Sequence, residues 1–192
     1  MPAQARPTAP SAPGRAPDPV AAIRAGDEAA FEALYLAHHD ALWRFAFAQV
    51  RSAAVAEELV QEVFLALWRD RAGWEVASSA RAWLYGAVRN QALNHLRHER
   101  VVARLADRTR AVPAESPADA HARLEAEELD TAIARALAAL PERRRVAMTL
   151  RWTHDLPAPE IARVLGTTPE AVRVLLTRAR QELGALLRLV RG

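Results

Sequence analysis

Residues 157–183 read PAPEIARVLGTTPEAVRVLLTRARQEL, and this stretch decides the fold of the C-terminal part of the chain. The spacing of Ile161, Val164 and Leu165 predicts a short helix with these three side chains turned inward. Gly166 follows at the point where a tight turn needs a positive φ, which glycine adopts without steric cost. The stretch therefore begins with a helix of about 158–165 that ends in a glycine turn.

A second helix is predicted directly after the turn. Thr168 can cap it, and Pro169 suits its first turn because the missing N–H of proline is not needed there. The predicted inward arc contains Val172, Leu175, Leu176, Ala179 and Leu183. The opposite arc contains Glu170, Arg173, Val174, Thr177 and Gln181, with Arg178 and Arg180 at its flanks. Two short helices joined by a glycine turn are typical of a helix-turn-helix.

The outward arc carries groups that suit the major groove of DNA. An arginine can bind guanine through two hydrogen bonds, and valine and threonine methyl groups can contact thymine methyl groups. Flanking arginines suit phosphates, which give affinity rather than sequence choice. The predicted phosphate contacts are Arg143, Arg144, Arg145, Arg151 and Arg180. The alternative is an ordinary helical hairpin with a solvated, arginine-rich face.

Charge is distributed unevenly along the chain. All 26 basic residues are arginine. Residues 20–100 hold 9 arginines against 10 acidic residues, whereas residues 131–192 hold 11 against 5. The overall charge of +3 therefore conceals a basic C-terminal third, as expected of a module that contacts phosphates.

Composition excludes several classes of protein. The 192 residues contain no cysteine, so disulfides, thiolate metal sites and thiol nucleophiles are excluded. No stretch has the length and apolar character of a signal peptide or a membrane span, and the expected location is cytoplasmic. The histidine pairs at 38–39 and 95–98 lack further metal ligands at a suitable spacing, and no catalytic constellation is evident. We expect no metal, no cofactor and no enzymatic activity.

Apolar periodicity predicts an all-α fold of two small helical domains. Residues 1–19 are rich in proline and small residues and read as a disordered tail. The first domain is expected over 20–102 and the second over 125–190. A flexible linker over 103–124, which contains two prolines, joins them.

The segment AEELVQEVFLALWR at 56–69 predicts a helix with one unusual exposed face. Leu65 lies on that face among polar side chains, namely Glu58, Gln61 and Glu62. A leucine among carboxylates suggests a surface for a partner. The alternative, a solvated face with one stray leucine, is equally compatible with the pattern.

The segment ARAWLYGAVRNQALNHLRHER at 80–100 predicts a helix with Leu84, Val88, Ala92 and Leu96 buried. Another face gathers Trp83, Gly86, Asn90, Asn94 and Arg97. Unpaired bases stack on aromatic rings, amides read base edges and arginine binds phosphate, so this face suits single-stranded nucleic acid. The alternative is that Trp83 belongs to the core and the amides are solvated.

Five segments in this order carry a family resemblance. They are FEALYLAHHDALWRFA, AEELVQEVFLALWR, ARAWLYGAVRNQALNHLR, ALAALPERRRVAMTLRW and EIARVLGTTPEAVRVLLTRAR. Together they resemble a bacterial RNA polymerase sigma factor of the extracytoplasmic-function group. The resemblance covers about residues 20–102 and 125–190. It implies a dissociable initiation factor that binds core RNA polymerase, through the β′ clamp helices and the β flap, and promoter DNA.

The resemblance also implies roles for positions in this chain. The helix at 56–69 looks like the part of domain 2 that docks on the clamp helices. The helix at 80–100 is similar to the element that opens the −10 region, where Asn90 matches an asparagine that captures a flipped base. The helix after Pro169 looks like the −35 reader. Members are often held by an anti-sigma factor, and no residue here identifies one.

Some positions depart from the family pattern. Glu58 stands where the family usually has Asp, Gly86 where a basic residue is frequent, and Asn94 where Asp is frequent. Val174 replaces a frequent small polar residue. These departures leave the promoter sequence open. Without the resemblance, a stand-alone repressor with the same C-terminal reader is the main alternative, and an enzyme with an appended DNA-binding domain is more distant.

Overall fold

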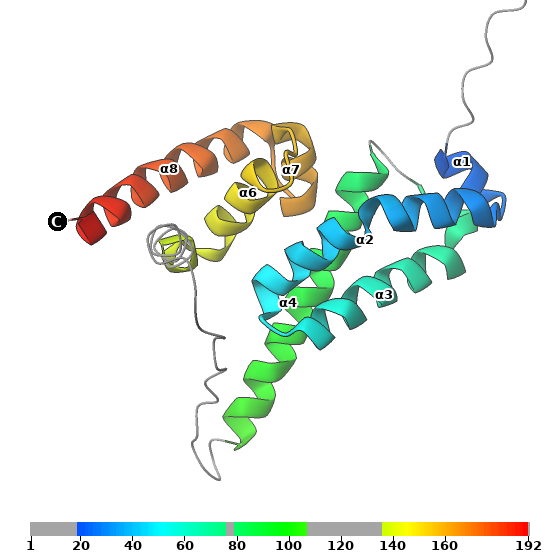
Figure 1. The fold of residues 1–192 in the computed structure, drawn as a ribbon, viewed down its shortest axis with the longest axis horizontal. Coiled ribbons are helices and arrows are strands. Elements are labelled where there is room, and N and C mark those ends of the chain that lie inside the picture. Colours follow the sequence, from blue (N-terminus) through cyan, green and yellow to red (C-terminus); the bar gives the residue numbers. More distant parts are fainter. Residues whose placement is uncertain (1–18, 76–78, 107–135, 192) are drawn as a thin grey trace, which may run out of the picture.

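The computed structural model describes residues 19–75, 79–106 and 136–191 (Figure 1). Every regular element within these ranges is helical, as the sequence predicts. The tail up to residue 18, most of the predicted linker and the first residues of the predicted second domain lie outside the described residues. None of the described helices is long and apolar enough to cross a membrane.

The first domain consists of four α-helices and a short 3₁₀ turn. They are α1 (Pro19–Arg24), α2 (Glu28–Val50), α3 (Ala53–Arg69), the 3₁₀ turn η1 (Arg71–Gly73) and α4 (Ala80–Ala106). Asp27 caps α2 by accepting a hydrogen bond from the backbone N–H of Ala30 at 3.0 Å. Ser52 caps α3 in the same way, from Val55. Helix α4 continues through the first residues of the predicted linker.

Apolar side chains from α2, α3 and α4 meet in one core. The three predicted residues Leu84, Val88 and Ala92 are buried on α4, while Leu96 is half-buried. Aromatic rings join α2 to α3, because Tyr35 lies 4.8 Å from Phe64 between ring centroids. Such edge-on contacts add stability beyond the hydrophobic contribution of the apolar area that they bury. The core fixes which faces of α3 and α4 remain available to partners.

Within the described residues, the second domain contains a helical stretch at 136–139, followed by α6 (Glu142–Trp152), α7 (Ala158–Leu165) and α8 (Pro169–Arg191). Helix α7 and the start of α8 have the bounds that the sequence predicts. The three residues expected to point inward from α7, Ile161, Val164 and Leu165, are all buried. Together α7 and α8 form the expected helix-turn-helix, with α6 packed across both.

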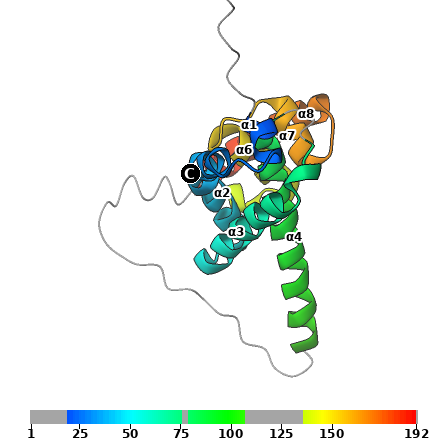
Figure 2. The same ribbon diagram turned by 90° about the vertical axis from the view of Figure 1, so that its right-hand side faces the viewer.

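The two domains pack against each other, with α7 beside α4 (Figures 1 and 2). The C-terminal half of α4 extends beyond the other helices (Figure 2). At the centre of the contact is His154, which follows α6 and is only 6% exposed. Its Nδ1 lies 2.9 Å from the hydroxyl of Tyr85 on α4, and its ring meets Phe45 of α2 edge-on at 5.7 Å.

Burial and positive charge both oppose protonation of His154. Burial lowers its pKa first, and the guanidinium groups of Arg44 on α2 and Arg81 on α4 lower it further, to about 4. The imidazole is therefore neutral, with one ring nitrogen bearing a proton and the other able to accept a hydrogen bond. The Nε2 atom has no hydrogen-bond partner within the described residues. Protonation would add a third positive charge between the two arginines.

Acidification is expected to loosen the packing of the two domains. An exposed imidazole has a pKa of 6.5, whereas packed His154 has a pKa of about 4. The contribution of His154 to the packing is therefore complete above pH 6.5 and is lost as the pH falls towards 4. Lowering the pH from 7.5 to 5.5 should raise the ratio of separated to packed domains by about tenfold. Small-angle X-ray scattering would report this as a larger radius of gyration.

The control is His154→Phe, which keeps an aromatic ring against Phe45 and removes the titrating group. It is needed because His38 on α2 also has a lowered pKa, owing to its burial and then to nearby Arg81. The variant should show a much smaller change in radius of gyration between pH 7.5 and 5.5. A change as large as that of the unaltered chain would show that His154 is not responsible.

Candidate nucleic-acid interface and polymerase-docking surface

The turn before α8 forms as the sequence predicts. Gly166 has φ +60° and ends α7 in the left-handed region. The hydroxyl of Thr168 accepts a hydrogen bond from the backbone N–H of Ala171 at 3.2 Å, which caps α8. Helix α8 begins at Pro169, where no N–H is required. These contacts fix the direction in which α8 leaves the turn.

The predicted reading face of α8 is open to solvent. All six predicted residues are exposed: Glu170, Arg173, Val174, Thr177, Arg178 and Gln181. Among the residues expected on the inward arc, Val172, Leu176, Ala179 and Leu183 are buried and Leu175 is half-buried. The second helix therefore has the two faces predicted from its sequence.

Two contacts within α8 preset the chemistry of the reading face. The guanidinium of Arg173 lies 3.1 Å from the carboxylate of Glu170, one turn earlier. A hydrogen bond to its own backbone N–H and the charge of Arg173 help to lower the pKa of Glu170, so the carboxylate is ionised. The hydroxyl of Thr177 donates to the carbonyl of Arg173 at 2.9 Å. With its hydroxyl engaged by the backbone, Thr177 offers its methyl group beside exposed Val174.

Most of the predicted phosphate contacts bind groups within the second domain. Arg143 donates to the carbonyl of Leu165 at the end of α7, and Arg144 pairs with Glu182 on α8. Arg145 donates to the carbonyls of Ala138 and Leu140, and Arg151 pairs with Asp155. Arg180 is exposed and makes no hydrogen bond or ion pair with the residues that the structure describes. The α6 arginines thus hold the helices of this domain together, and their contact with phosphates stays a prediction.

The polar face predicted on α4 is present, though one flank is covered. Asn90, Asn94 and Arg97 are exposed, and the Arg97 guanidinium donates to the Asn94 side-chain oxygen at 3.0 Å. Trp83 is half-buried and meets the ring of Trp74 edge-on at 5.5 Å. Gly86 faces α7, since a Cβ built there would lie 3.9 Å from the Cα of Val164.

A cavity of about 280 Å³ lies beside Trp83. Its walls come from the end of α3, from η1 and from the start of α4, and the lining residues are Ala66, Leu67, Asp70, Gly73, Trp74, Glu75 and Trp83. Trp74 is only 5% exposed, and its indole N–H has no hydrogen-bond partner among the described residues. The indole nitrogen has almost no accessible surface, so the part of the cavity wall that a ligand could touch is the rest of the Trp74 ring and the ring of Trp83.

The predicted docking face of α3 is exposed along its length. Glu58, Gln61, Glu62 and Leu65 all face solvent, with Leu65 61% exposed. The Gln61 amide donates to Glu57 at 2.7 Å, and Glu57 lies 3.2 Å from His39 of α2. Partial burial opposes protonation of His39, but hydrogen bonds to Asp40 and Glu57 raise its pKa overall. The face therefore combines an apolar side chain with mainly acidic neighbours.

Sequence reasoning did not identify Trp74, Tyr85 or His154. The described residues contain no group of three or more histidine, aspartate or glutamate side chains placed to bind a metal ion. Trp74 follows η1, outside the helical periodicity that singled out Trp83. Tyr85 and His154 are separated by 69 residues in sequence, so no local pattern connects them.

Comparison with known proteins identifies both domains. Residues 34–101 match the family model "Sigma-70 region 2", and residues 130–183 match "Sigma-70, region 4". The chain is 33% identical over 167 residues to the RNA polymerase sigma factor CarQ of Myxococcus xanthus, covering 86% of this chain and 93% of CarQ. It is 30% identical over 176 residues to the ECF RNA polymerase sigma factor SigM of Mycobacterium tuberculosis, covering 88% and 82% respectively.

Solved structures show the same fold. CnrH in complex with the cytosolic domain of CnrY superimposes with a TM-score of 0.65 at 26% identity, covering 89% of this chain and 96% of CnrH. The sigma factor RpoE of Bartonella quintana, solved with the anti-sigma factor NepR, gives 0.64 at 24% identity, covering 82% and 96%. The two family models match successive parts of the chain, and the alignments with these relatives and structures each cover more than four fifths of it. The chain belongs to the RNA polymerase sigma factor family, in its extracytoplasmic-function (ECF) group.

Proposed function

We propose that this sigma factor divides promoter recognition among three surfaces, with α8 reading the −35 duplex, α4 and the Trp74 cavity holding the melted −10 strand, and α3 docking on core RNA polymerase. As a member of its family, the protein directs polymerase to specific promoters. The observation that carries the residue assignments is the exposed Asn90–Asn94–Arg97 face on the same helix as a cavity lined by Trp74 and Trp83. We expect the protein to act in the cytoplasm, beside the polymerase, without catalysing a reaction itself.

Binding a flipped base would bias the promoter towards the open form. Unstacking and unpairing a base costs a few kcal/mol. Contacts that exist only with the unpaired strand can offset that cost, whereas contacts shared by duplex and single strand cannot. The 280 Å³ cavity is flanked by the ring of Trp83, on which an unpaired base could stack. Asn90 and Arg97 would hold the neighbouring nucleotides and phosphates.

The −35 reader would combine one charged contact with two apolar ones. Glu170 steadies the guanidinium of Arg173 at 3.1 Å, in a position to bind a guanine edge. The methyl groups of Val174 and Thr177 would contact thymine methyl groups. Arg178 and Gln181 continue the face, and Arg180 would contact phosphate. The repressor alternative accounts for α8 but leaves the α4 face and its cavity without a role.

The polymerase-docking surface would lie on α3. Leu65 supplies an apolar anchor, and Glu58 and Glu62 supply charges that suit a basic partner surface. The clamp helices of the β′ subunit are the partner that we propose for this face, and the β flap for the second domain. An anti-sigma factor is a further proposed partner, because the similar protein CnrH was solved with the cytosolic domain of CnrY bound to it.

Replacing Asn90 with alanine should separate promoter binding from promoter opening. Holoenzyme carrying Asn90→Ala should still bind promoter duplex, because the −35 contacts remain, but should lose open complex and transcript. Permanganate reactivity of −10 thymines measures the opening directly. The control is Gln91→Ala, which is turned by about 100° from the face on α4. Normal permanganate reactivity in Asn90→Ala would refute the role of Asn90.

Trp83→Leu tests the cavity. The substitution keeps an apolar side chain beside Trp74 but removes the ring on which a base would stack. Stacking on an aromatic ring contributes about 1–3 kcal/mol per base, so open-complex formation should fall at least about fivefold. The reduction should disappear on a promoter in which the base that would enter the cavity is abasic. An equal reduction on the intact and the abasic promoter would show that the Trp83 ring does not contact that base.

Arg173→Ala tests sequence readout at −35. The loss of a two-bond guanine contact should weaken discrimination at one −35 position by about 1–3 kcal/mol. Arg180→Ala provides the contrast, since a phosphate contact should weaken binding to all sequences alike and reduce its salt dependence. Competition binding of holoenzyme to promoters with single −35 substitutions measures both. A loss that is equal on every sequence would show that Arg173 is only a phosphate contact.

A further inference from the structure

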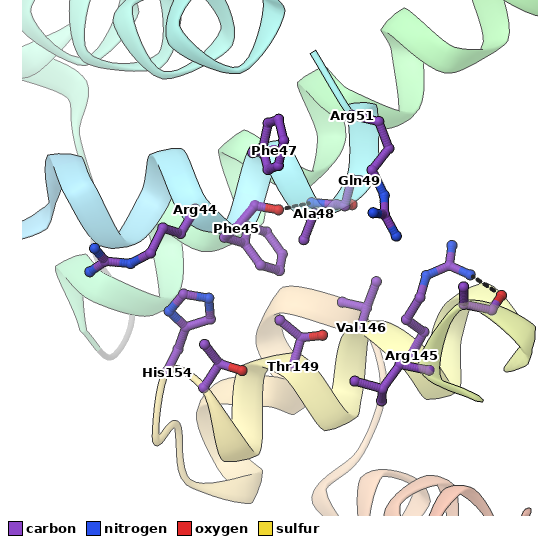
Figure 3. A pocket seen from close by; sticks show the side chains of 13 residues that line it. Arg44, Phe45, Phe47, Ala48, Gln49, Arg51, Arg145, Val146, Thr149 and His154 are labelled. Carbon is purple, nitrogen blue, oxygen red and sulfur yellow. Dashed lines mark hydrogen bonds between the residues drawn. The ribbon is translucent and has the colours of Figure 1, made fainter. Parts of the chain in front are cut away.

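A second cavity of about 280 Å³ lies between α2 and α6, separate from the cavity beside Trp83 (Figure 3). Residues of both domains line it. The C-terminal half of α2 contributes one wall, and the helical stretch at 136–139, α6 and the two residues after α6 contribute the other. An apolar cavity of about 150 Å³ already accommodates benzene. The cavity is therefore large enough for a small organic molecule of about two rings.

The part of the lining that solvent can reach is largely apolar. On α2, Phe47 is 37% exposed and Ala48 is exposed. On the facing stretch, Leu137 is half-buried and Ala138 is exposed. The ring of Phe47 is stacked on that of Trp43, with centroids 5.3 Å apart and planes 7° from parallel, so its position is set by its neighbour. An apolar group held among these side chains would lose contact with water, which favours binding.

Positive charge surrounds this apolar lining. Arg44, Arg51 and Arg145 line the cavity, and none of the described residues that line it is acidic. In Figure 3, Arg51 and Arg145 lie at one end of the cavity and Arg44 lies at the other. Arg145 donates to the carbonyls of Ala138 and Leu140, which are neutral. Arg44 and Arg51 make no hydrogen bond or ion pair within the part of the chain that the structure describes.

The end of the cavity at Arg51 and Arg145 has the chemistry of an anion site. Arg51 belongs to the first domain and Arg145 to the second, and their like charges repel each other unless an anion lies between them. Guanidinium groups bind carboxylate and phosphate through two parallel hydrogen bonds. Arg51 is exposed and Arg145 is half-buried, so both can reach an anion in the cavity. The arrangement suits a ligand whose anionic group binds here and whose apolar body extends along the lining towards Arg44.

We propose that the cavity between α2 and α6 is a binding site for a small organic anion, an apolar body bearing one carboxylate or phosphate group, held by Arg51 and Arg145. The inference does not depend on the proposed function, because Arg145 alone among the lining residues was assigned to a promoter contact. Since both domains line the cavity, the complete site exists only while they are packed. The bound anion therefore stabilises the packed arrangement, as any ligand stabilises the form that it binds.

Titration of the full chain with 2-naphthoate and with 2-naphthamide tests the site. The two probes have nearly the same shape and differ in the charge of the head group. Naphthoate should bind with a Kd of about 1 mM or below, and naphthamide about tenfold more weakly, because hydrogen bonds to an ionised acceptor are the stronger ones. Proton–nitrogen-15 NMR spectra report the affinity and the place of binding, which should include both α2 and α6. Equal binding of the two probes, or shifts confined to other helices, would overturn the proposal.

Two further probes examine the head group and the apolar body separately. The comparison of 2-naphthyl phosphate with 2-naphthoate shows whether the site prefers phosphate or carboxylate, and tighter binding of either than of naphthamide supports the site. Inorganic phosphate alone should bind about tenfold more weakly than naphthyl phosphate, because it leaves the apolar lining empty. Inorganic phosphate that binds as tightly as naphthyl phosphate would contradict the proposal, since the apolar lining would then have no role.

Variants of one arginine locate the anionic group. Arg51→Gln removes one of the two guanidinium groups and should weaken naphthoate binding about tenfold, whereas Arg51→Lys keeps the charge and should restore part of the affinity. Arg24→Gln, which removes an exposed arginine from α1, is the matched control and should bind like the unaltered chain. An equal loss in Arg24→Gln and Arg51→Gln would mean that naphthoate responds only to the overall charge of the protein, and the proposal would fail.

Ala48→Phe tests the apolar lining with every charge retained. Ala48 is exposed on α2, and Figure 3 shows its side chain turned towards α6, so a phenyl ring there should fill the cavity without entering the core. Naphthoate binding should be lost in a variant whose NMR spectrum shows a folded chain. Ala37→Phe, at an exposed position of α2 that does not line the cavity, is the control and should leave binding unchanged. Naphthoate binding that survives in Ala48→Phe would place the probe on surface arginines and overturn the proposal.

Discussion

The packing of a neutral imidazole between two arginines holds the described molecule together. His154 reaches from the end of α6 into a site formed by Phe45, Arg81 and Tyr85, and it shares a hydrogen bond with Tyr85 while uncharged. This contact and the packing of α7 against α4 set the mutual position of the two domains. It is also a contact that one proton would weaken, since the added charge would face Arg44 and Arg81. The packed arrangement is therefore specific without being rigid.

Separate surfaces allow a chain of 192 residues to perform several tasks. Helix α4 presents one face to the core, one to the second domain and one that we assign to unpaired DNA. Helix α8 presents its reading face to solvent even when the domains are packed. The packing of the two domains thus leaves the face that we assign to duplex reading uncovered.

Local rules predicted the parts of the structure that depend on neighbours in sequence. The φ of Gly166, the cap at Thr168 and the two faces of α8 follow from positions a few residues apart. The exposure of Leu65 followed from helical spacing in the same way. Contacts over long separations could not be predicted. Nothing near His154 indicates Tyr85, and the arginines of α6 read as free cations although carbonyls and Glu182 hold them.

The distance between the two domains tests the central claim most directly. Spin labels on Ala37→Cys of α2 and Ala185→Cys of α8, both exposed positions in a cysteine-free chain, allow it to be measured by pulsed electron paramagnetic resonance. The account predicts one short, narrow distance distribution at pH 7.5 and a larger fraction of long distances at pH 5.5, where protonation of His154 opposes the packing. The same narrow distribution at both pH values would contradict it, and so would a broad distribution at pH 7.5.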